Sequence, residues 1–280
     1  MPIFDTPAPI SVVLNLMLGQ VRIVASDRTE STVEAFPRDS DDQDDVQAAE
    51  QLRIEYVGGR LLVNIPKPGG SGGAVILVIA VPTGSSLRGR GVAADFLAVG
   101  KLGECHLHTG LGHIRLDRTG SLRLSASFGD ITVDQAAGNV EVMANCGDVH
   151  LGQVEGRTTV RAMGDGSATV GEVRGAARLH TDRGAIRIGR AHIGVEARTT
   201  QGDIDIEEVA RGAVLATTTY GSIRIGVAEP SNASLSLDSG AGTVYTSLSL
   251  LAAQMEADEA VRVEARTVIG NVVVERSPSE

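Results

Sequence analysis

Gly129-Asp130-Ile131-Thr132-Val133 begins the stretch that decides the fold. Nine residues after Ile131 and Val133 come Val140 and Val142, which flank the polar Glu141. The unit then starts again with Gly147-Asp148-Val149-His150-Leu151, 18 residues after Gly129. A fixed period near 18 with alternating apolar and polar residues inside it is typical of a stacked β-solenoid.

A glycine marks the start of this unit nine times, and the first eight marks are 17, 18, 19, 18, 18, 19 and 21 residues apart. We expect these glycines at the corners of the coils, because glycine adopts positive φ without a steric penalty. The aspartates that follow, such as Asp130 and Asp148, are expected to bond nearby amides in the turn. The nine positions are Gly112, Gly129, Gly147, Gly166, Gly184, Gly202, Gly221, Gly242 and Gly270.

Two aligned positions in each unit are aliphatic and form the predicted inner rows. Sixteen of these eighteen residues are Ile, Leu or Val. The step of nine residues between strands argues against a left-handed hexapeptide helix, and leucine-rich or propeller repeats fit worse. The sequence therefore predicts an all-β, right-handed parallel β-helix of about nine coils of roughly 18 residues each. The rows are Ile114, Ile131, Val149, Ala168, Ile186, Ile204, Ile223, Val244 and Val272, and Leu116, Val133, Leu151, Val170, Ile188, Ile206, Ile225, Thr246 and Val274.

Residues 1–83 are β-rich but lack the period, and we interpret them as an antiparallel β segment that caps the solenoid of residues 84–280. Gly19-Gln20 and Gly58-Gly59 each lie between apolar runs and predict two hairpins. Pro82 ends the run that begins at Ala74. A cap has a physical purpose, because the first coil would otherwise expose unpaired backbone groups.

Near the other end, a short insertion at 251–260 resembles one or two helical turns. It separates the Gly242 and Gly270 units, which are 28 residues apart. Strands are predicted at 261–265 and 272–274.

Composition excludes several functions. The formal charge is −10, and there is no Trp and only three Tyr and four Phe. Nucleic-acid binding normally needs a basic stripe with stacking aromatics, so we exclude it. Two cysteines form neither a disulfide framework nor a metal knuckle. Cys105 aligns with aliphatic positions and is expected to be buried, whereas the position of Cys146 beside a corner is compatible with exposure.

Two clusters resemble metal sites only in part. The acidic run Asp39–Asp45 keeps half of the calcium-loop pattern, since Glu50 holds the twelfth position but Asp44 stands where the sixth needs glycine, so a solvated, disordered loop is expected. His106 and His108 lie on one face of a predicted strand, but no third ligand follows, so we expect surface residues. No catalytic residue, cofactor-binding residue or metal ligand is predicted, and no cofactor. The outward row after each corner lacks a carboxylate pair for glycoside hydrolysis.

The Gly-Asp-Ile/Val-x-Ile/Val units, the segment 78–85 and the closing segment 265–272 resemble the bacterial β-strand-repeat family of unknown function labelled "putative adhesin". The resemblance covers nearly the whole chain and implies a role in surface adhesion. Several corners depart from Gly-Asp, among them Gly112-His113 and Gly166-Ser167. The departures leave the fold intact and argue against a catalytic aspartate.

We therefore predict a non-enzymatic binding or scaffold module with an unidentified protein or glycan partner. A self-assembling, polymerising scaffold is the alternative, and a carbohydrate-active β-helix enzyme is a weaker one. The sequence does not settle the oligomeric state. The first apolar run, Val12 to Leu18, is interrupted by Asn15 and follows no basic residue. We expect neither a signal peptide nor a transmembrane segment, and hence a cytoplasmic protein.

Overall fold

The structure is a computed structural model that describes residues 2–64, 73–229, 231–248 and 260–277. It divides into two compact units, residues 1–137 and 138–280, and each is described by itself. The boundary expected between residues 83 and 84 lies inside the first unit, and the capping role of residues 1–83 stays a prediction.

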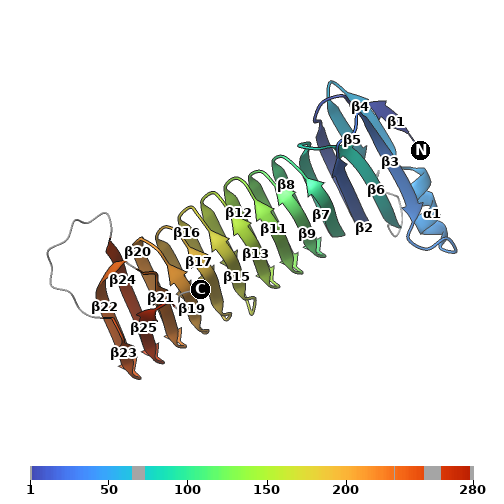
Figure 1. Cartoon of the computed structure of the whole chain (residues 1–280). Helices are drawn as coiled ribbons and strands as arrows, with labels where there is room; N and C mark the ends of the chain where they lie inside the picture. The colour runs from blue at the N-terminus through green and yellow to red at the C-terminus, as the bar shows by residue number, and fades with distance from the viewer. Residues whose placement is uncertain (1, 65–72, 230, 249–259, 278–280) are drawn as a thin grey trace. The chain divides into compact units, whose positions relative to one another are not determined.

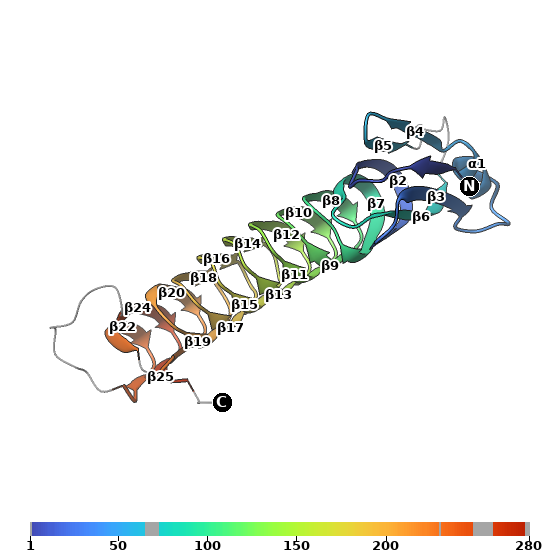
Figure 2. The same ribbon diagram turned by 45° about the horizontal axis from the view of Figure 1, so that its top comes forward.

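Both units are built from parallel coils, which confirms the predicted all-β parallel solenoid. Each coil contributes one strand to each of two faces, and strands of successive coils pair in register (Figures 1 and 2). In the first unit the coils follow β7 (Ser86–Lys101), namely β8 (Cys105–Leu111) with β9 (Ile114–Thr119) and β10 (Leu122–Phe128) with β11 (Ile131–Ala136).

The second unit continues the same pattern of two strands per coil. Its first five coils are β12 (Val140–Cys146) with β13 (Val149–Val154), β14 (Thr158–Ala162) with β15 (Ala168–Val173), β16 (Ala177–Thr181) with β17 (Ile186–Ala191), β18 (Val195–Thr199) with β19 (Ile204–Val209), and β20 (Gly212–Tyr220) with β21 (Ile223–Val227).

The inner rows form the core. Ile186, Ile204 and Ile223 are each 0% exposed, as are their partners two residues further along. A threonine three residues before many corner glycines is also buried. Its hydroxyl donates to a corner carbonyl, as Thr218 does to Gly202 at 3.0 Å. This bond satisfies a carbonyl that the tight corner would otherwise leave without a partner.

Two physical reasons require glycine at the corners. The sequence predicted only the first, which is a positive φ. Gly129, Gly202 and Gly221 have φ of 131°, 156° and 153°, as expected. Gly184 does not have positive φ, yet a Cβ there would collide with the carbonyl oxygen of Gly166 in the adjacent coil. Close stacking of backbones therefore requires glycine even where φ does not.

The aspartates after the corners bond to amides as predicted, but the amide belongs to the next coil. Asp148 Oδ1 accepts from the Ser167 N–H at 2.8 Å, and Asp203 Oδ1 accepts from the Ser222 N–H at 2.7 Å. Each such side chain links two coils rather than closing its own turn.

The N-terminal segment contains the expected antiparallel pairs. The hairpin at Gly58-Gly59 is confirmed as β4 (Arg53–Val57) with β5 (Arg60–Asn64). In addition, β3 (Glu30–Pro37) pairs antiparallel with β1 (Ile3–Asp5) and with β6 (Ala74–Pro82).

The hairpin predicted at Gly19-Gln20 is wrong. β2 (Ser11–Ser26) is one strand that pairs in parallel with β5 and β6 on one side and with β7 on the other. Its buried residues change phase at Gly19, from even positions such as Leu16 to odd positions such as Val21. Gly19 therefore turns the chain through a solenoid corner without reversing it, and β2 spans both faces.

The acidic run is also ordered, contrary to the expected disordered loop. Asp42 caps the N-terminus of α1 (Gln43–Glu50) by accepting from the Asp44 N–H at 2.9 Å. Asp45 is only 8% exposed and accepts from the N–H groups of Asp39 and Ala74 at 2.9 and 2.6 Å. An acidic first turn also suits the helix dipole.

The last strands in sequence are not the last in space. β24 (Ala260–Ile269) lies between β20 and β22 (Asn232–Ala241). Likewise, β25 (Val272–Arg276) lies between β21 and β23 (Val244–Thr246). The strands predicted at 261–265 and 272–274 are confirmed, but this order was not predicted. The helical turns predicted at 251–260 lie, apart from Ala260, outside the described residues.

Candidate functional site: a basic hollow on the first unit

The candidate site is a hollow of about 710 Å³ on the outer face of β2, β7, β8 and β10. Arg88 and Arg90 of β7 pair in register with His106 and His108 of β8. Arg123 of β10 pairs with His106 on its other side. Neighbouring strands lie about 4.8 Å apart, so the five basic side chains form a compact group. We call these five residues the basic hollow.

Strand alternation explains why these residues share a face. In β7, Leu87 and Gly89 point inward and are buried, while Arg88 and Arg90 point outward and are exposed. The ring of Phe96, from the second half of the same strand, fills the core beside Gly89. A Cβ on Gly89 would meet that ring at 2.9 Å. Glycine at this position thus lets the aromatic ring pack under the hollow.

Part of the charge of the basic hollow is not neutralised. No carboxylate lines it. His106 Nε2 lies 2.9 Å from Glu104 Oε1. Arg88 and Arg90 form no salt bridge with any residue that the structure describes. The hollow therefore concentrates positive charge on a protein whose formal charge is −10.

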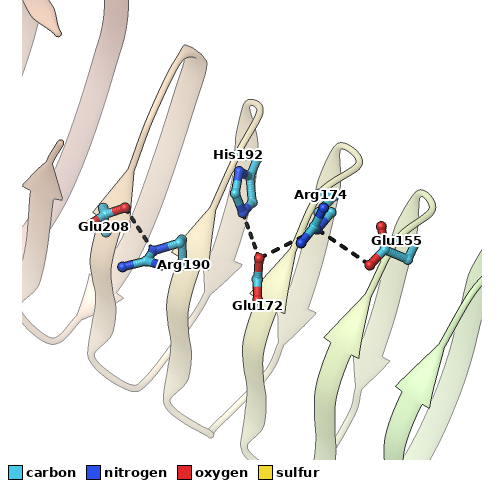
Figure 3. Close-up of polar contacts among 6 residues, drawn as sticks. All are labelled: Glu155, Glu172, Arg174, Arg190, His192 and Glu208. Carbon is cyan, nitrogen blue, oxygen red and sulfur yellow. Dashed lines mark hydrogen bonds and ion pairs between the residues drawn. The ribbon is translucent and has the colours of Figure 1, made fainter. Parts of the chain in front are cut away.

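The second unit arranges its charges differently. Figure 3 shows alternating acids and bases on successive coils, where Arg190 meets Glu208 at 2.9 Å and His192 meets Glu172 at 2.8 Å. The hydrogen bond from His192, followed by the nearby Arg174, lowers the pKa of the Glu172 carboxyl below its ordinary value. The arginines here are paired with glutamates, in contrast to the lining of the basic hollow, which holds no carboxylate.

The cysteines and histidines occupy the places that the sequence indicated. Cys105 is 0% exposed, and burial, with a smaller effect of Glu104, raises its thiol pKa to about 12. Cys146 is exposed. His106 and His108 point outward beside buried Cys105 and Leu107. The described residues include no group of three potential metal ligands, and the arginines beside these histidines would repel a cation.

The sequence did not predict Arg88 and Arg90 as site residues. The outward row considered for catalysis lies on the strands that follow the corner glycines, whereas the basic hollow lies on the other face. The signal was present as Arg-x-Arg at 88–90 and His-x-His at 106–108. Placing these pairs side by side needed the register of β7 against β8, and β7 lacks the corner glycine.

The sequence profile of Toastrack DUF4097 matches residues 11–248. The chain belongs to this Toastrack family. The match begins at the first residue of β2, in agreement with the finding that β2 forms solenoid coil.

One solved structure shows the same fold at low sequence identity. A "putative adhesin" from Parabacteroides merdae ATCC 43184 is 14% identical, with a TM-score of 0.50 over 98% of this chain and 94% of its own. A second "putative adhesin", from Parabacteroides distasonis ATCC 8503, is also 14% identical, with a TM-score of 0.37 over 98% and 95% of the two chains. No curated protein matches this Toastrack chain. No described helix has the length and apolar character needed to span a membrane.

Proposed function

We propose that this Toastrack protein is a non-enzymatic, adhesin-like binding module whose basic hollow binds an anionic glycan. The observation that carries the proposal is the group of Arg88, Arg90, His106, His108 and Arg123 on three adjacent strands, with no lining carboxylate. Arginine pairs with carboxylate and sulfate groups through charge-assisted, often bidentate hydrogen bonds. The Parabacteroides merdae protein of the same fold is named a "putative adhesin", which supports a binding role.

The lining chemistry favours this ligand class over its competitors. Neutral sugars and single-stranded nucleic acids are usually bound on Trp, Tyr or Phe platforms, and none of these side chains lines the hollow. General acid–base cleavage of a glycan needs a pair of carboxyl groups, which the lining also lacks. An anionic polymer bound without being cut fits both observations. The expected cytoplasmic location stays a prediction, which fractionation of the native host tests.

The test uses heparin as a sulfated glycan probe and compares two double variants of the full chain. Arg88→Glu with Arg90→Glu reverses two charges in the basic hollow. Arg161→Glu with Arg262→Glu makes the same net change at exposed positions of the second unit. We expect the first variant to weaken heparin binding at least about tenfold, because two charge-assisted contacts become repulsive, while the second stays close to the wild type.

Binding is measured by calorimetry at several salt concentrations, and the wild-type affinity should fall as salt rises. Equal loss in both variants would show that net charge alone is responsible and would overturn the assignment of the site. Tighter binding of single-stranded DNA than of heparin would overturn the ligand class. Appearance of new reducing ends in the heparin would contradict a non-enzymatic role.

A further inference from the structure

Asn15 is a polar residue in the middle of the first apolar run of the chain. It lies inside the 16-residue strand β2, although asparagine is disfavoured in strands. It lines the basic hollow and pairs in register with Arg90 of β7. Its side chain is exposed and forms no hydrogen bond with any residue that the structure describes. The amide of Asn15 is therefore available to a ligand that the arginines hold.

The register of six strands places one polar side chain per strand in a line across the outer face of the first unit. Residues that pair in register direct their side chains to the same face of a sheet, so the line is continuous from β4 through β5, β2, β7 and β8 to β10. Only its last member is half-buried, and the other five are exposed. We call this line the polar row, and its members are Arg53, Asn64, Asn15, Arg90, His108 and Ser125.

Along the strands, the positive charge of the basic hollow ends quickly. Glu104 immediately precedes β8 and lies 2.9 Å from His106. At the other end, Val92 follows Arg90 by two residues in β7 and is 54% exposed. A polyanion that followed the strands would therefore meet a carboxylate at one end and an apolar side chain at the other.

Across the strands, two rows leave the hollow and differ in character. The row of Arg88 passes through the apolar Val13 and Leu62 and ends at Glu55 of β4. The polar row contains no carboxylate and ends at Arg53, two residues before Glu55. An anionic chain that crosses the strands is thus favoured along the polar row.

Arg53 lies on the open face of its hairpin. The opposite face is covered, because the Tyr56 ring of β4 packs against Phe4 with ring centroids 5.4 Å apart, and Leu61 and Val63 of β5 are buried. Arg53 itself is exposed and forms no salt bridge with any described residue. Its guanidinium group is therefore a second place where an anionic group can bind.

We propose that the polar row holds an internal stretch of a linear anionic polysaccharide, which lies across the strands. The ligand assignment rests on the proposed function and narrows it from any anionic glycan to a chain of several sugars. Arg90 and Arg53 bind acidic groups, and the asparagine amides, with two N–H donors and one acceptor each, bind hydroxyl groups between them. The six strands span about 24 Å, from five steps of about 4.8 Å.

The test measures the affinity of the full chain for two heparin fragments, a disaccharide and a dodecasaccharide. The disaccharide covers only the basic hollow, so the wild type should bind the dodecasaccharide at least about tenfold more tightly. Calorimetry measures the longer fragment, and NMR titration measures the weaker disaccharide.

Two variants with matched controls test the outlying contacts. Arg53→Gln should weaken dodecasaccharide binding at least about fivefold and leave disaccharide binding unchanged. Arg22→Gln makes the same change of charge at an exposed position of β2 beyond the corner, on the other face, and should bind like the wild type. Asn15→Val should weaken dodecasaccharide binding at least about threefold, whereas Gln20→Val, which also removes an exposed amide from β2, should not.

The variant with Arg88→Glu and Arg90→Glu, measured beside these, separates the polar row from the proposed function. Wild-type binding of both fragments by that variant would overturn the proposed function and the polar row together. Loss of binding in that variant, with Arg53→Gln equal to Arg22→Gln and Asn15→Val equal to Gln20→Val, would overturn the polar row alone. Equal affinity of the wild type for the two fragments would also overturn it, because the ligand would then occupy the hollow only.

Discussion

At the scale of single residues, Cys105 and Cys146 should differ sharply in thiol reactivity. Cys105 is buried with a thiol pKa of about 12, and Cys146 is exposed. The thiolate is the reactive form, so maleimide at mildly alkaline pH should label Cys146 rapidly and Cys105 only after unfolding. Mass spectrometry of digested protein measures both sites. Labelling of Cys105 in folded protein would contradict its placement in the core.

The same thiol links pH to stability. In the unfolded chain it ionises near its ordinary value of 9.0, whereas the native thiol keeps its proton up to about 12. Between these values the unfolded state binds fewer protons than the native state, so the free energy of unfolding falls as pH rises from 9 to 12. Cys105 thus favours the fold fully below pH 9.

At the scale of elements, the stacking of coils should make corner glycines costly to replace even without positive φ. In Gly184→Ala the new methyl group would strike the Gly166 carbonyl of the adjacent coil. In Gly58→Ala there is only the strain of a φ of +57°, since no atom lies within 4 Å of the new Cβ. We expect losses of more than about 2 kcal/mol for the first and about 1 kcal/mol for the second.

Urea unfolding of both variants measures this difference. Equal losses would show that conformational strain, rather than the close approach of stacked backbones, accounts for the glycine at position 184. Circular dichroism of the native variants checks that each retains its β structure.

Prediction from sequence succeeded where the period repeats and failed where one coil stands alone. The aliphatic pair seen at Ile131 and Val133 recurs from unit to unit and so identifies the inner rows. These rows in turn predict the parallel coils. Gly19 lies outside the period, because β3, α1 and β4–β6 separate its coil from the next one. Its local pattern equally fits a hairpin or a corner, and only pairing with β7 decides between them. The basic hollow was not predicted for the same reason. Arg88 can be recognised as a site residue only when β7 is placed in register beside β8.

At the scale of the whole molecule, the order of the final coils makes stability depend on the end of the sequence. In an ordinary solenoid each coil rests on the one before it. Here β22 and β23 rest on β24 and β25, which follow them in the chain. The coil at 232–246 therefore cannot gain its partners until the later strands are present.

A chain truncated before Ala260 should consequently lose more than the strands that are removed. β22 and β23 would have no described partner, so their amides should exchange rapidly with deuterium. β20 and β21 should stay protected, because they also pair with β18 and β19. Hydrogen exchange followed by mass spectrometry compares these segments with β14 and β15, which are distant from the cut. Slow exchange retained at 232–246 would mean that β22 can pair directly with β20. The order of residues 232–246 would then not depend on β24.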